Sequence, residues 1–532
     1  MKKIITVLLA LIFVFSMVVP AVSAENKQDL PLIYFSGRGC ELIRPDGTWV
    51  WEPEGSVIDN MKDNASDIAK ALVKCNLTRN FDEFNDLIYD CVAPVYSESA
   101  LGKDGFPTDG SKVPDHLNWR LGLDRIKTSI SIDEGRYPVY RWHYDWRLSP
   151  ITLADELKDL IDAVLADSGA SQVNILSRCE GSTITYCYLY KYGTDFVHSC
   201  VLNSDITEGL DFTTSLFSGE ITIDPRALNN FVQYFADVKD ITIKDEETTD
   251  MLLDLISLMQ STGVLKLATE LFEFGADTVK DDLIPRLLKS SFATFPAYWS
   301  MVTPEKYEQA KQFIFEDDAE EYAQLIALTD QYFEMQKNCR EFLKSASEKV
   351  NICIIAKYGL PEIPLSENAN EESDIYLATR LGSHGAVCAD YDSTLSNGYI
   401  ARQTEAGLGK YISPDRKIDA STCALPDTTW FVKGMAHRCF AACVDTLSVE
   451  FVNSDGMTVD SDENYPKFIQ FVPTNNADIN DQEGYVVPVE PVEQGNPIME
   501  NPVVKMITTP IVRFWEFIKS FIRFIKTVVP AA

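Results

Sequence analysis

The stretch Val173–Leu189, "VNILSRCEGSTITYCYL", combines an apolar strand, a tight turn of small residues and the start of a helix. A turn of this kind is a nucleophile elbow, which needs small residues two positions before and two positions after the nucleophile because strand and helix approach closely there. Ser177 and Gly181 meet that need around Cys179. The pattern therefore predicts Cys179 as the nucleophile, at a position where many hydrolases carry serine.

Three interpretations of Cys179 stay open at the level of sequence: a working nucleophile, a disulfide partner, or the remnant of a lost active site. The base of an elbow faces packed sheet, which disfavours a disulfide. A cysteine is a competent nucleophile when a histidine lowers its pKa. The cationic Arg178 favours a thiolate, whereas the carboxylate of Glu180 opposes one unless it points away. We take the working nucleophile as the expectation.

The rest of the chain indicates an α/β fold. From Pro31 to about Phe471, short β-rich runs alternate with longer helical stretches, as in a mostly parallel sheet with helices on both faces. The run Thr152–Gly169 has apolar residues at helical spacing and ends at a glycine. Strands are expected at Leu32–Phe35, Tyr137–Trp142, Val173–Leu176, Cys200–Asn203, Val350–Ala356 and Thr429–Lys433.

The N-terminal residues predict export. Lys2 and Lys3 precede an apolar run from Ile4 to Val19, and small residues follow it, so residues 1–24 are expected to be a signal peptide. We expect the protein to be secreted or peripherally attached to the outer face of the cell membrane.

Charge and cysteine spacing exclude several classes of function. The net charge of −33 repels nucleic acid, so substrates are expected among neutral or amphiphilic molecules. The twelve cysteines form no CxxC pair, which argues against zinc ribbons and thioredoxin-type sites. The sequence therefore predicts no metal and no cofactor.

Residues 207–347 differ in character from their surroundings, because they are helical in pattern and rich in Leu, Met and Phe. They would divide an α/β core into two parts, residues 25–206 and 348–485. The insertion would be either a helical cap over a substrate pocket or simply additional core helices. We favour the cap, since pockets form readily where two such units meet.

The C-terminal segment has two parts. Residues 486–509 are rich in Pro and Glu and read as an extended linker. Residues 510–529 form a basic amphipathic pattern with a broad apolar and aromatic face, whose five charges argue against a membrane span. Such a helix suits a membrane surface. The alternative is a helix docked on the body of the protein.

A family resemblance appears in the segment that leads to the elbow. Tyr144–Leu148, "YDWRL", followed by a helix, a strand and the elbow, resembles the lecithin:cholesterol acyltransferase-like branch of the α/β-hydrolases. Pro31–Leu42, "PLIYFSGRGCEL", is similar to the oxyanion loop of that family. The resemblance implies an α/β-hydrolase fold and an acyl hydrolase or acyltransferase acting on lipid-like esters without a cofactor.

The resemblance also implies the order nucleophile, aspartate, histidine. His437 follows a strand and is the expected base. The segment "DYDSTLS" resembles the family's "GDGTVP" loop and maps its aspartate onto Asp392, with Asp390 as the second choice. The backbone N–H groups of Arg38 and Glu180 are the expected oxyanion hole.

Family members carry a small disulfide-closed lid between the first strand and "YDWRL". The resemblance therefore implies a lid disulfide between Cys75 and Cys91, although the residues between them differ from the family. Two functions from other classes remain: a catalytically inactive surface protein that binds lipid or a partner, and a cysteine peptidase or amidase.

Overall fold

The structure is a computed structural model that describes residues 30–37, 40–50, 57–78, 80–125, 127–128, 138–237, 279–316, 318–439, 441–474 and 483–492. The expected signal peptide (1–24) and the C-terminal amphipathic helix (510–529) lie outside the described residues. Among the described helices, none is long and apolar enough to cross a membrane.

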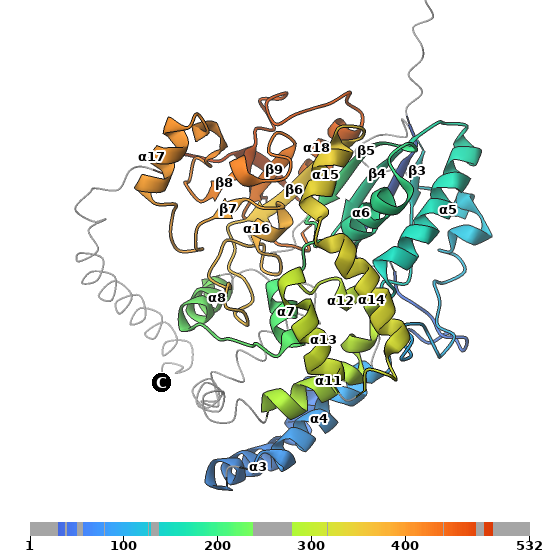
Figure 1. Cartoon of the computed structure of the whole chain (residues 1–532), viewed down its shortest axis with the longest axis vertical. Helices are drawn as coiled ribbons and strands as arrows, with labels where there is room; N and C mark the ends of the chain where they lie inside the picture. The colour runs from blue at the N-terminus through green and yellow to red at the C-terminus, as the bar shows by residue number, and fades with distance from the viewer. Residues whose placement is uncertain are drawn as a thin grey trace, which may run out of the picture.

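The core is a nine-stranded sheet with the order β11-β10-β9-β6-β5-β4-β1-β3-β2 (Figure 1). All neighbours from β3 to β10 are parallel, and the edge strands β2 and β11 are antiparallel. This confirms the expected α/β fold of the α/β-hydrolase type. The strands are β1 Leu32–Phe35, β2 Lys127–Thr128, β3 Val139–Arg141, β4 Val173–Arg178, β5 Val197–Asn203, β6 Asn351–Tyr358, β9 Thr429–Lys433, β10 Phe468–Pro473 and β11 Gly484–Pro488.

The central strands β4, β5 and β6 are buried along nearly their whole length, because both faces of the sheet are covered. Successive residues alternate between two hydrophobic clusters, as Ile175 and Leu176 of β4 do. Helices α5 (Pro150–Ser168) and α6 (Glu180–Tyr192) contribute to the first cluster, and α18 (Ala442–Val452) contributes to the second. Buried α5 ends at Gly169, whose φ of 71° is the left-handed conformation that suits glycine.

Between β5 and β6 the described residues form helices and no strand. Several of these helices share a separate aromatic core around Trp299, Phe315 and Tyr322. Helix α4 (Asp82–Ser97), from early in the chain, packs against α11 of this region (Figure 1). The main helices are α7 Asp211–Ser218, α8 Pro225–Asp237, α11 Ile284–Ser290, α12 Pro296–Trp299, α13 Tyr307–Phe315, α14 Ala323–Gln336 and α15 Cys339–Ser347.

The "YDWRL" motif joins distant segments to the sheet. The Arg147 guanidinium is fully buried and binds the Asp145 carboxylate through Nε and Nη2, at 2.9 and 2.7 Å. It also donates to the Ser99 carbonyl at 3.0 Å and to the Ser111 hydroxyl at 2.7 Å. The Tyr144 hydroxyl donates to carbonyls of the loop after β1. The motif therefore fixes the loop that approaches the elbow.

Two sequence expectations are wrong. Cys75 of α3 (Ala65–Thr78) and Cys91 of α4 are separate buried thiols, and Cys91 donates to the Asn60 carbonyl at 3.6 Å instead of forming a disulfide. The linker does not begin at residue 486, because β11 continues to Pro488 and pairs with β10. A proline is tolerated there because β11 is an edge strand.

Candidate active site

Cys179 lies at the sharp turn between β4 and α6. Its backbone has φ 52° and ψ −127°, a conformation rarely adopted by a non-glycine residue and typical of functional sites. Two hydrogen bonds hold the turn: the Cys179 N–H donates to the Asn203 carbonyl, and the Ser182 N–H donates to the Cys179 carbonyl, both at 2.9 Å. A Cβ at Gly181 would lie 3.0 Å from the Phe35 ring, which explains the small residue. The elbow predicted from the sequence is therefore present.

His437 lies beside Cys179 and carries a carboxylate partner. The imidazole lies close enough to Cys179 to interact with its side chain, and Nδ1 of His437 lies 2.8 Å from Oδ2 of Asp374. The backbone N–H of His437 also donates to the Asp374 carbonyl at 2.9 Å. Oδ1 of Asp374 accepts from the N–H groups of Tyr376 and Leu377, so the carboxylate is fixed in place. A cysteine, an imidazole and a carboxylate thus form one continuous chain of contacts.

Strand topology brings these three residues together. Cys179 follows β4, Asp374 lies in the loop after β6, and His437 lies in the loop after β9. These strands are parallel, so their carboxyl ends meet at one edge of the sheet. Ligands of open parallel sheets bind outside that edge.

The electrostatics of the group favour a protonated His437. Burial alone lowers the pKa of this imidazole, but the charges of Asp374 and Cys179 outweigh it and raise the pKa to about 10. A histidine that carries a proton at neutral pH stabilises a neighbouring thiolate. The same proton is then available for a leaving group.

Lys357 holds the loop that carries His437. It lies in β6 and is buried, and its ammonium donates to the carbonyls of Ala436, His437 and Cys439 at 3.0, 2.9 and 3.0 Å. Burial lowers the pKa of Lys357 to about 8, against the opposing charge of Asp374. The histidine is thereby positioned by the central sheet.

The loop after β1 approaches the elbow at Gly37. A Cβ on Gly37 would lie 2.7 Å from Cβ and 2.8 Å from Sγ of Cys179, and 3.1 Å from the Glu180 nitrogen. The hydroxyl of Tyr144 donates to the Gly37 carbonyl at 3.0 Å. Glu180 is the first residue of α6, and the first N–H groups of a helix have no intrahelical partner. Arg38, the other expected oxyanion donor, lies outside the described residues.

The two charged neighbours of Cys179 do not oppose a thiolate. Burial, together with the charge of Cys179, raises the pKa of the Glu180 carboxyl well above its usual range, which favours its neutral form. Arg178 points to the other face of the sheet, where its guanidinium pairs with Asp445 and donates to the Tyr34 hydroxyl at 3.0 Å.

An apolar wall faces the thiol. Cys179, Phe212 and Met301 are partly buried and pack against a cluster made of Ile206, Leu210, Leu377, Ala378 and Leu381. The ring of Tyr376 lies between Phe212 and His437, with centroids 6.2 and 5.8 Å away. The side chains around the nucleophile are therefore apolar, as in sites that bind a hydrocarbon group.

The expected acid, Asp392, is not at this site. Arg226 of α8 binds both Asp392 and the second choice, Asp390, with Nε 2.9 Å from Asp392 and Nη1 2.7 Å from Asp390. The carboxylate beside His437 is that of Asp374. The residue after Asp374 is Ile375, with a φ of 89°, where glycine would be at ease. Ile375 stands where the family's loop has the glycine after its aspartate. The sequence pattern therefore did not mark Asp374.

Replacing Asp374 by Asn removes the negative charge that raises the pKa of His437, so the pKa should fall from about 10 towards the ordinary value of about 6.5. The chain has five histidines, so NMR titration of protein with 13C-labelled imidazoles can follow His437. The matched variant Asp392→Asn should leave this titration unchanged. An unaltered His437 pKa in Asp374→Asn would contradict the assigned pairing.

Gly37→Ala should displace the thiol, because the new methyl would overlap Cys179 and the backbone nearby. A displacement near 1 Å typically lowers the rate by about 100-fold. Ester turnover and thermal unfolding should be measured together. The control is Gly398→Ala, whose Cβ would meet nothing nearer than 3.7 Å. Equal turnover by the two variants would show that the close approach does not matter.

Comparisons with known proteins do not assign this chain to a family. No family model matches the chain, and no curated protein matches it. One similar solved structure is "The crystal structure of Tle4-Tli4 complex", which is 13% identical with a TM-score of 0.24. The alignment covers 62% of this chain and 75% of that chain.

Proposed function

We propose that this protein is an acyl hydrolase or acyltransferase that acts on lipid-like esters through Cys179, His437 and Asp374. The observation that carries the proposal is the continuous contact from the strained elbow cysteine to His437 and on to Asp374. This is the arrangement of a nucleophile, a base and a residue that orients the base. The lecithin:cholesterol acyltransferase-like family remains a resemblance at the "YDWRL" and elbow segments.

The first half of the reaction forms a thioester. His437 holds the proton of the Cys179 thiol from the start, and Asp374 orients the imidazole and stabilises its positive form. The sulfur attacks the ester carbonyl, while the backbone N–H of Glu180, with that of Arg38 as the second proposed donor, stabilises the oxyanion. When the carbon–oxygen bond breaks, His437 returns the proton to the departing alkoxide.

The second half releases the acyl group. A water or alcohol gives its proton to His437 and attacks the thioester carbonyl, and the Cys179 sulfur leaves. A thioester reacts readily with acceptors better than water, so an alcohol that binds near the site would turn hydrolysis into transfer. The raised pKa of Glu180 supports this chemistry, because it favours a carboxyl without negative charge next to the sulfur.

The apolar wall supports a lipid-like acyl chain. Phe212 and Met301 pack, as Cys179 does, against the buried cluster that includes Ile206 and Leu377. Burial of each methylene contributes about 0.8 kcal/mol, so a long chain gains affinity from such a wall. A peptide would instead need polar partners for its backbone along the same surface.

We further propose that the protein works outside the cytoplasm and at a membrane surface. Two sequence patterns support this: the signal-peptide pattern of residues 1–24 and the basic amphipathic pattern of residues 510–529. In this proposal residues 207–347 act as a cap that brings the apolar wall against the acyl chain.

Turnover of p-nitrophenyl esters tests the proposed function. The wild type should cleave the dodecanoate with a higher kcat/KM than the acetate and should leave a casein substrate intact. Cys179→Ala should lose ester turnover, and Asp374→Asn should lower it by about 10²–10⁴-fold, as loss of the orienting carboxylate does in related triads. Asp392→Asn, the matched control, should retain it.

Two results would overturn the proposal. Ester turnover that persists in Cys179→Ala would place the chemistry elsewhere. Wild-type protein that turns over neither ester, while folded, would favour an inactive binding scaffold, and casein cleavage that depends on Cys179 would favour a peptidase.

A further inference from the structure

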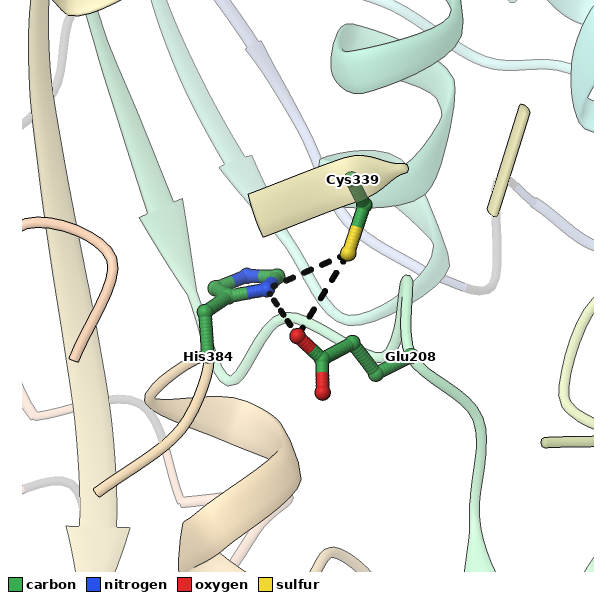
Figure 2. Close-up of side chains that lie close together, drawn as sticks. All are labelled: Glu208, Cys339 and His384. Carbon is green, nitrogen blue, oxygen red and sulfur yellow. Dashed lines mark hydrogen bonds and ion pairs between the residues drawn. The ribbon is translucent and has the colours of Figure 1, made fainter. Parts of the chain in front are cut away.

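A second group of reactive side chains lies away from Cys179. Glu208, Cys339 and His384 point toward one another from three separate segments (Figure 2). Glu208 follows β5, Cys339 is the first residue of α15, and His384 follows the short helix α16 (Thr379–Gly382). All three are buried, and His384 is fully inaccessible. The proposed ester chemistry uses none of them.

We propose that Glu208, Cys339 and His384 bind one Zn²⁺ ion. A carboxylate oxygen, a thiolate sulfur and an imidazole nitrogen form a donor set typical of protein zinc sites. The sequence contained no spacing that indicated this site, because its members are 131 and 45 residues apart along the chain. The site is separate from the Cys179 chemistry and does not depend on it.

The spacing of the three donor atoms suits a tetrahedral zinc ion. Sγ of Cys339 lies 3.4 Å from Oε1 of Glu208 and 3.8 Å from Nδ1 of His384, and these last two atoms are 3.1 Å apart. Zinc bonds of about 2.0–2.3 Å at tetrahedral angles put ligand atoms roughly 3.3–3.6 Å apart. Shifts of a few tenths of an ångström would therefore complete the site.

The outer partners are those that zinc ligands usually have. Nε2 of His384 lies 2.8 Å from Oδ2 of Asp205, which fixes the ring and leaves Nδ1 facing the other two donors. Asp205 is held by the Thr207 hydroxyl at 2.6 Å. Arg340 donates to Oε1 of Glu208 at 2.6 Å. A carboxylate oxygen has two acceptor sites, so this bond leaves one for a metal.

Charge also balances around a divalent ion. Glu208, Asp205 and the Cys339 thiolate that a metal would hold supply three negative charges. Zn²⁺ and Arg340 supply three positive charges. A buried group of this kind is stable only when its charges are paired, and the neutral total meets that requirement with the ion bound.

A cavity beside the group leaves room for a fourth ligand. A cavity of about 860 Å³ is lined by Glu208, Cys339 and Arg340, together with residues of α7 and α14. His384 adopts a φ of 54°, a strained conformation for a non-glycine residue that is often kept at functional sites. The geometry points to three protein ligands and one water on the cavity side, with the ion joining α15 to the loops after β5 and α16.

Cobalt substitution tests the site in the full chain. Metal-stripped protein, kept reduced, is titrated with Co²⁺, and one equivalent should produce a thiolate-to-cobalt charge-transfer band and the intense visible bands of four-coordinate cobalt. Zn²⁺ should displace the cobalt. Cys339→Ser should lose the charge-transfer band, whereas Cys423→Ser, a similarly buried cysteine outside the ligand group, should keep it.

Affinity gives a second readout. Asp205→Asn keeps the three ligands and should weaken Zn²⁺ binding by about 10–100-fold, measured by competition with a chromophoric chelator. Cys179→Ala should bind Zn²⁺ as the wild type does, which separates this proposal from the ester chemistry. The proposal is overturned if the wild type binds no stoichiometric Co²⁺, or binds it without the thiolate band. If Cys339→Ser does not fold, the wild-type spectrum alone decides.

Discussion

The contact between His437 and Asp374 is the interaction on which the rest of the site depends. Nδ1 and Oδ2 lie 2.8 Å apart, and a backbone hydrogen bond between the same two residues joins the loops after β6 and β9. This contact fixes the imidazole beside Cys179, and the charge of Asp374 helps to raise the histidine pKa. Lys357 reinforces the arrangement by holding the His437 loop from within the sheet.

Parts of this site were predictable because the information is local in the sequence. The elbow follows from an apolar strand, flanking small residues and a helix around Cys179, and His437 follows directly after a strand. Asp374 was missed because its loop extends well beyond β6 and carries Ile375 where a glycine would mark the turn. The end of strand β11 was missed because a segment rich in proline and glutamate follows it directly, and an edge strand tolerates the proline at its end.

Pairings between distant residues were the least predictable. The implied bond between Cys75 and Cys91 rested on a family pattern, and the structure keeps both thiols apart. Arg226 binds Asp390 and Asp392. This pairing depends on where helix α8 lies in the fold, and the spacing of these residues in the sequence does not predict it. The Glu208, Cys339 and His384 group is of the same kind. Each residue looks ordinary in its own segment, and only the fold brings them together (Figure 2).

The chain thus carries two different cysteine environments. Cys179 is partly exposed against an apolar wall, while Cys339 is buried among polar donors. Intact mass spectrometry after incubation with p-nitrophenyl dodecanoate tests the central claim most directly. The account predicts one added acyl group on the wild type, removed by hydroxylamine as thioesters are, and none on Cys179→Ala. Acylation of Cys179→Ala, or a folded wild type that never acquires an acyl group, would contradict it.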